Sequence, residues 1–232
     1  MDVALLAVII VFTGILLVRL QTRHVRRVAA ERRSVLADLQ YVLDGSELVQ
    51  RGIDYPVLTG DYRGARVTIG LIVDTLTMRE LPTLWLSVTR WRPLPLTGPV
   101  DMLLRPSSTD IVSPGERFPV QHPVPQTWPS HIRVATPLGG RPHLHQLSAS
   151  LPLLHDRRTK DVLLSPTGAR LITRLARAEL GHYRLVRRPK FKPQLSAEEL
   201  TASLDAVCAM TEGIVQSAAD DRRGLSSASG GT

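Results

Sequence analysis

Residues 66–73 read RVTIGLIV and residues 84–89 read LWLSVT, and these two runs decide the fold class. Apolar side chains occupy every second position in both runs, which is the period of a β-strand with one buried face. Residues 56–59, which lead into a glycine-containing turn at 60–64, predict a strand before them. Residues 100–104 predict a strand after them, behind a loop rich in proline and glycine. Short connections between four successive strands predict an antiparallel meander with one packed face.

The C-terminal half predicts a helix, a strand and a second helix. Ser165-Pro166 is a favourable helix start, and the apolar residues that follow have helical spacing up to Gly181. Residues 182–188 are predicted as a strand, with one further short strand at 131–134. Ser196 and Glu199 form a capping-box pattern at the start of the second helix, whose apolar side includes Cys208. The composition from residue 216 to 232 predicts a disordered tail.

The N-terminus predicts a membrane anchor. Residues 3–18 read VALLAVIIVFTGILLV, without a charge, and would span about 24 Å as a helix. The run follows Asp2 and precedes a cluster of arginines, which is the order of a stop-transfer segment and not of a cleaved signal peptide. The positive-inside rule then predicts that the C-terminal side lies in the cytoplasm.

These patterns divide the chain into four parts. Residues 1–20 are the predicted transmembrane anchor, and residues 21–44 a basic juxtamembrane helix with an apolar stripe that includes Val28, Val35 and Val42. Residues 45–215 are the predicted cytoplasmic α+β domain, and residues 216–232 the disordered tail. The predicted fold class is α+β: an N-terminal transmembrane helix, an antiparallel β-meander and a helix–strand–helix half.

The turn at residues 60–64 carries the pattern Gly60-x-Tyr62-x-Gly64-x-x-Val67. It resembles the entry into a β-hairpin in uncharacterised bacterial single-pass membrane-anchored proteins. The resemblance implies a location in the bacterial inner membrane, and the charge order described above predicts that the N-terminus lies outside. It implies no activity for this chain.

Positive charge is concentrated in two short segments, residues 19–33 and residues 184–192, of a chain whose formal net charge is +8. Because basic residues beside a membrane span attract anionic lipid headgroups, both segments are candidate lipid or anion contacts. Nucleic acid is not expected as a partner, because only Tyr183 and Phe191 supply aromatic rings near the second segment. The candidate contact residues are Arg23, Arg26, Arg27, Arg32, Arg33, Arg184, Arg187, Arg188, Lys190 and Lys192.

Three histidines are the only metal candidates. His143, His145 and His155 could bind a transition metal together with Asp156 or Asp161, although their spacing matches no known zinc site. The single cysteine excludes a disulfide framework, and no nucleophile or phosphate-loop motif is present. We therefore expect no catalytic residues and no cofactor.

Three functions follow as hypotheses. The favoured one is a single-pass membrane protein whose cytoplasmic domain is an interaction or scaffold module for a protein partner that the sequence does not identify. The alternatives are a membrane-tethered, metal-dependent hydrolase and a domain that binds anionic lipid through residues 184–192.

Overall fold

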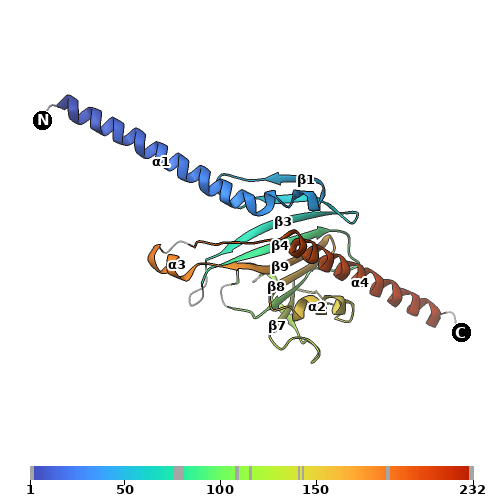
Figure 1. The fold of residues 1–232 in the computed structure, drawn as a ribbon. Helices are drawn as coiled ribbons and strands as arrows, with labels where there is room; N and C mark the ends of the chain where they lie inside the picture. The colour runs from blue at the N-terminus through green and yellow to red at the C-terminus, as the bar shows by residue number, and fades with distance from the viewer. Residues whose placement is uncertain are drawn as a thin grey trace.

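The computed structural model describes residues 3–75, 81–107, 110–114, 117–140, 142, 144–186 and 189–229, without the side chains of residues 3–9, 222 and 224–229. A nine-stranded sheet lies at the centre, and two long helices extend from it in different directions (Figure 1). The helical elements are α1 (Val3–Ala37), η1 (Gln40–Val42), η3 (Gln146–Ser150), α2 (Leu151–His155), α3 (Leu180–Val186) and α4 (Ala197–Ser229). The strands are β1 (Asp44–Val49), β2 (Val57–Tyr62), β3 (Ala65–Asp74), β4 (Thr83–Trp91), β5 (Val100–Leu104), β6 (Val120–His122), β7 (Ile132–Thr136), β8 (Thr159–Ser165) and β9 (Gly168–Arg177).

The sheet confirms the α+β class and changes the predicted strand order. All neighbouring strands are antiparallel, and their order is β1-β2-β3-β4-β9-β8-β5-β7-β6. Strands β2, β3 and β4 form the predicted meander, and β1 extends it at one edge. Strand β5 has the predicted bounds but does not pair with β4, because the β8–β9 hairpin lies between them.

The predicted helix from Ser165 to Gly181 is wrong. Ser165 ends β8, the chain turns at Pro166-Thr167, and residues 168–177 form β9, whose first residue Gly168 pairs with Ser165. Proline at the second and glycine at the fourth position of Ser-Pro-Thr-Gly are also favourable in a tight turn. The turn signal therefore competed with the helix-start signal, and pairing of β9 with β4 along its whole length favours the strand.

The close packing of β9 on β4 makes Gly168 sensitive to substitution. A Cβ atom at this position would lie 2.2 Å from the backbone oxygen of Arg90. We expect Gly168→Ala to lower the free energy of unfolding by about 2 kcal/mol, because backbone has to shift to relieve the overlap. Urea unfolding of the full chain in detergent, followed by tryptophan fluorescence, measures this.

Gly98→Ala is the matched control, because a Cβ atom at Gly98 would meet nothing within 4 Å. This control is expected to change the free energy of unfolding by less than about 0.5 kcal/mol. Equal effects of the two substitutions would contradict the packing argument.

The main core lies between one face of the sheet and the helices. It is built from apolar side chains of α4 and of the strands. They include Leu200, Leu204, Val207 and Ile214 of α4 and Leu58, Ile69, Leu86 and Leu171 of the strands. The predicted capping box starts α4, since Glu199 N donates to Ser196 Oγ (3.1 Å) and Ser196 N to Glu199 Oε2 (3.3 Å). Cys208 is buried on the inner side of this helix, as predicted.

The helix α4 continues to Ser229, so the disorder predicted from residue 216 is not observed over residues 216–229. Asp221 in this part of the helix accepts hydrogen bonds from Gln146 Nε2 (2.8 Å) and contacts His145 Nε2 (2.9 Å). Asp220 also pairs with Arg223 on the helix surface (3.0 Å). These contacts supply partners for polar side chains that the composition alone assigns to solvent.

The Gly60–Gly64 motif connects three elements. A Cβ atom at Gly60 would lie 2.7 Å from Leu43 Cβ, so glycine allows the segment after η1 to pack closely on β2. Tyr62 Oη donates to Asp205 Oδ1 of α4 (2.6 Å). Burial is the largest cause that raises the pKa of Tyr62, and this hydrogen bond raises it further. Arg63 and Gly64 both have positive φ, as a two-residue hairpin turn requires.

The helix α1 belongs to the domain only at its C-terminal end. Leu36 is buried in the main core, followed by Leu39 and Leu43, so the core begins before residue 45. The helix ends at Ala37 and not near Leu43 as predicted, and the N-terminal part points away from the sheet (Figure 1). Within the described part of the chain, no helix combines the length and hydropathy that crossing a bilayer requires.

Candidate membrane-facing surface

One end of the sheet collects the elements that carry the predicted lipid contacts. Asp74 at the end of β3 pairs with Thr83 at the start of β4, and Thr83 pairs with Arg177 at the end of β9. Because the strands alternate in direction, β8 starts and β5 ends at this same end of the sheet. We call it the basic end; the opposite end carries the turns at residues 63–64 and 166–167.

The helix α1 leaves the domain at the basic end. The loop between β1 and β2 lies there, and Gln50 Nε2 of this loop donates to the backbone oxygen of Ala29 in α1 (2.9 Å). Arg32 Nη1 donates to the backbone oxygen of Ile53 (2.6 Å), and its guanidinium lies 5.0 Å from the centre of the Tyr55 ring. Arg32 therefore fixes α1 to the loop and is half-buried.

The other predicted contacts on α1 remain at the surface. Arg23, Arg26 and Arg27 are exposed on the part of the helix that leaves the domain, and Arg33 is exposed next to Arg32. Arg27 pairs with Glu31 one turn further along (3.1 Å), and such an exposed pair contributes little to stability. These guanidinium groups are accessible to anions in solution.

The second predicted segment also lies at the basic end, because it follows β9. Its residues 182–188 were predicted as a strand, but residues up to Val186 belong to the short helix α3, and Arg187 and Arg188 lie outside the described residues. Arg184, Lys190 and Lys192 are exposed. The hydrogen bond from Lys192 lowers the pKa of Glu179, whose Oε1 lies 2.5 Å from Lys192 Nζ.

Sequence reasoning missed four further arginines at this end. Arg105, Arg158, Arg174 and Arg177 come from segments up to 72 positions apart, and pairing of β8 and β9 brings them together. Burial is the largest cause that lowers the pKa of Arg174, and the positive charges of Arg177, Arg105 and Arg158 lower this pKa further. Only the strand order, which the sequence did not reveal, could have identified this cluster.

The histidine candidates do not form a metal site among the described residues. His143 lies outside the described residues, His145 contacts Asp221, and His155 is exposed at the end of α2. Asp156 Oδ1 instead accepts the backbone N–H of Arg158 (2.7 Å). Asp161, the other proposed ligand, is buried within the sheet.

Asp161 belongs to a buried group of charged residues on the sheet face opposite α4. Arg170 Nη2 lies 3.1 Å from Asp161 Oδ2, and Arg133 Nη2 lies 3.2 Å from Asp101 Oδ2. Ser113 Oγ donates to Asp101 Oδ2 (2.7 Å) and accepts from Arg133 Nη2 (2.6 Å). Both carboxylates have no exposed surface, so they are closed to a ligand in solution, whereas the side chains of Arg133 and Arg170 are partly exposed.

The two carboxyl groups of this group interact directly. Burial raises the pKa of Asp161 well above its usual value, and the charge of Asp101 and a hydrogen bond to it raise it further, against Arg170. Asp101 Oδ1 and Asp161 Oδ1 are the oxygens for which the described residues offer no other donor. A proton on Asp161 satisfies both oxygens, since a carboxyl group can donate to a carboxylate.

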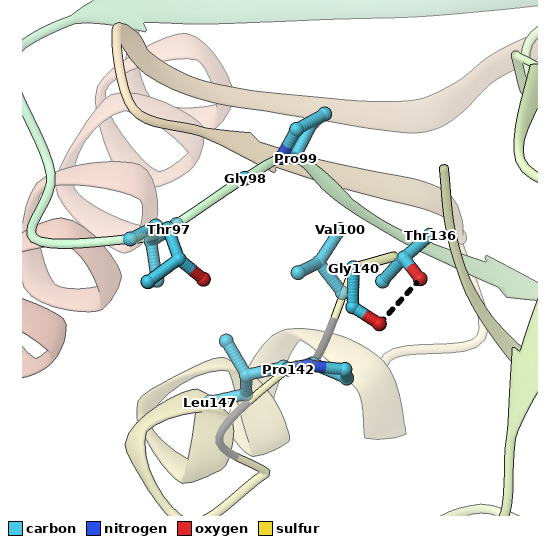
Figure 2. A pocket seen from close by; sticks show the side chains of 9 residues that line it. Thr97, Gly98, Pro99, Val100, Thr136, Gly140, Pro142 and Leu147 are labelled. Carbon is cyan, nitrogen blue, oxygen red and sulfur yellow. Dashed lines mark hydrogen bonds between the residues drawn. The ribbon is translucent and has the colours of Figure 1, made fainter. Parts of the chain in front are cut away.

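Two hollows in the described part of the chain are too small or too open to enclose a substrate. The pocket between the 96–100 loop, Thr136, Gly140, Pro142 and Leu147 has a volume of about 10 Å³ (Figure 2). That is room for about one water, and Thr136 Oγ1 donates to the Gly140 oxygen at its edge (3.3 Å). An open groove of about 270 Å³ lies between the C-terminal end of α1 with the residues that follow it, up to Leu39, and Pro193–Leu195.

Comparison with known proteins adds one structural neighbour. No family model matches the sequence, and no curated protein matches it. Among solved structures, the mycobacterial trehalose monomycolate transport factor A (TtfA) aligns with a TM-score of 0.39 at 11% sequence identity. The alignment covers 82% of this chain and 94% of that one.

Proposed function

We propose that this chain is a single-pass protein of the bacterial inner membrane whose cytoplasmic α+β domain is an interaction or scaffold module. The observation that carries this proposal is the surface of α1. The apolar side chains from Ile10 to Leu20 are 51–73% exposed, whereas Leu36 of the same helix has no exposed surface. Large apolar side chains in such a row are unfavourable in water and favourable in lipid.

The charge order supports the orientation. The apolar run of residues 3–18 is followed by Arg19, Arg23, Arg26 and Arg27, and an excess of basic residues next to a span is typical of its cytoplasmic side. With the N-terminus outside, the sheet and α4 lie in the cytoplasm, where a protein partner has access to them. The arginines then lie at the level of the anionic headgroups.

Charged substitutions within the apolar run test the anchor. We expect the full chain to stay in the membrane fraction after an alkaline wash. The double substitution Val11→Arg and Ile15→Arg is expected to release it, because each arginine near the middle of a span costs about 3 kcal/mol. Quantitative immunoblotting of pellet and supernatant measures the release.

Gln21→Arg with His24→Arg is the matched control, because it adds the same two charges outside the apolar run. This control is expected to remain in the membrane. Extraction of the unsubstituted chain by the alkaline wash would exclude the proposed anchor. Protease digestion of the domain in intact spheroplasts would exclude the proposed orientation.

A second candidate function is supported by the basic end. Arg184, Lys190 and Lys192 lie at the end of the sheet where α1 leaves the domain, together with Arg174 and Arg177. A domain held by α1 therefore directs this positive surface toward the membrane that α1 enters. Binding of anionic lipid by the domain adds to the tether and does not replace the protein partner.

A further inference from the structure

The helix α3 exposes apolar side chains next to positive charge. It contains no buried residue, and Leu185 is 86% exposed and Val186 50% exposed. Arg184 on the same helix is exposed, as are Lys190 and Lys192 after it. Apolar side chains that project from a basic surface are typical of elements that lie in the headgroup region of a bilayer.

The segment that carries α3 is joined firmly to the sheet. At its start, Ala178 N donates to the backbone oxygen of Pro82 (2.8 Å). Glu179 N donates to the backbone oxygen of Lys190 (2.9 Å), and the Glu179 side chain pairs with Lys192, so both arms of the segment are held together. The two arms of the segment are therefore held together where they leave the sheet, and α3 with its exposed side chains lies beyond the basic end.

The geometry of α1 places a membrane within reach. Between Ala29, which contacts the β1–β2 loop, and Leu20, the last residue of the predicted anchor, α1 advances by about 14 Å. The headgroup region accounts for about 6 Å of this distance. A modest tilt of α1 and the roughly 10 Å length of α3 cover the remainder. Figure 1 shows α3 on the side of the sheet toward which the N-terminus points.

We propose that α3 is a second membrane contact, which inserts Leu185 and Val186 into the interface of an anionic leaflet. The exposed cations Arg184 and Lys190, with Arg174 and Arg177 behind them, bind the lipid phosphates, whereas Arg158 is paired with Glu199 and Arg105 donates to the backbone oxygen of Thr159. This proposal rests on the proposed anchor, because α1 brings the basic end to the bilayer. The ligand of α3 is the bilayer surface and not a protein.

A fluorescent label at position 185 tests the insertion. The full chain with Leu185→Cys, labelled with an environment-sensitive dye, is incorporated into nanodiscs of phosphatidylcholine with or without phosphatidylglycerol. We expect a blue shift and an increased emission only with the anionic lipid. Cys208 contributes little background, because it is buried and burial raises the pKa of its thiol.

Leu138→Cys is the matched control position. Leu138 is 83% exposed and follows β7 at the opposite end of the sheet, where Ala135 pairs with Asp101. Its label is expected to report water in both kinds of disc. An equal blue shift at positions 185 and 138 would overturn the proposal, because the dye alone would then explain the signal.

Substitutions that remove positive charge test whether docking of α3 on the bilayer depends on the cations beside it. Arg184→Gln with Lys190→Gln is expected to lower the docking equilibrium constant about fivefold for each charge, whereas Arg66→Gln with Arg223→Gln should leave it unchanged. Unchanged docking in the first pair would overturn the proposal. A chain that incorporates into both discs without a spectral difference overturns α3 docking alone, and a chain that enters no disc overturns the anchor as well.

Discussion

Replacing Arg90 with alanine is expected to lower the free energy of unfolding by about 3 to 4 kcal/mol. Arg90 lies on β4, is only 2% exposed and joins the sheet to α4. Its Nη1 donates to Thr211 Oγ1 (2.5 Å), and its Nη2 donates to the backbone oxygen of Arg63 (3.4 Å) and lies 3.6 Å from Glu212 Oε1. Alanine removes these contacts and leaves a cavity beneath the helix.

Arg90→Met separates packing from charge. Methionine fills most of the space, and no buried partner is left charged, because Glu212 is half exposed and retains Arg92 at 3.7 Å. Thr211 Oγ1 can still donate to the Val207 oxygen in its own helix (3.0 Å). We therefore expect Arg90→Met to cost less than about 1.5 kcal/mol.

Urea unfolding of the full chain in detergent measures both variants. A loss with methionine as large as the loss with alanine would show that hydrogen bonding, and not packing, makes Arg90 important. A negligible loss with alanine would show that α4 is held by its apolar side chains alone.

The strands of the meander could be predicted from the sequence because each run has one buried face. Buried and partly exposed positions alternate along most of β4, and in β3 they alternate from Val67 to Gly70, so the period of two is visible without the structure. The start of α4 was equally visible, because a capping box needs only local residues. These predictions depend on contacts within a few positions.

The errors arose where distant contacts decide the structure. The apolar residues Leu171, Ile172, Leu175 and Ala176 satisfy a helical period, but pairing with β4 and β8 requires them to be a strand. Insertion of this hairpin separates β5 from β4. Local propensity is a weak prior wherever tertiary pairing competes with it.

The candidate site divides in the same way. The two basic segments are contiguous in sequence and were found, whereas Arg105, Arg158 and Arg174 become neighbours only through the sheet. Arg32 was placed with the lipid contacts, although its guanidinium is engaged by Tyr55 and Ile53. The exposure of Leu185 could not be predicted, because a strand with the same residues would bury one face.

Replacing Asp161 with alanine is expected to cost about 2 to 3 kcal/mol, because Arg170 loses the acceptor at Asp161 Oδ2 and the buried Asp101 Oδ1 is left without a donor. Asp161→Asn is expected to cost less than about 1 kcal/mol at pH 7. Its amide nitrogen can donate to Asp101 Oδ1 and its oxygen can accept from Arg170, so both neighbours keep a hydrogen-bond partner. A loss with asparagine as large as with alanine would show that Asp161 carries a negative charge in the folded state.

The pH dependence distinguishes the two charge states further. Burial is the largest cause that raises the folded-state pKa of Asp161 above 3.8, and the charge of Asp101 and a hydrogen bond to it raise this pKa further. The positive charge of Arg170 lowers it in part. Arg133 and Ser113 donate hydrogen bonds to Asp101. Between 3.8 and the raised pKa the folded state binds more protons than the unfolded state, so stability falls as pH rises through this window. Urea unfolding at a series of pH values should therefore show the unsubstituted chain losing stability relative to Asp161→Asn as pH increases. The opposite trend would mean that Arg170 outweighs burial and that the pair holds no shared proton.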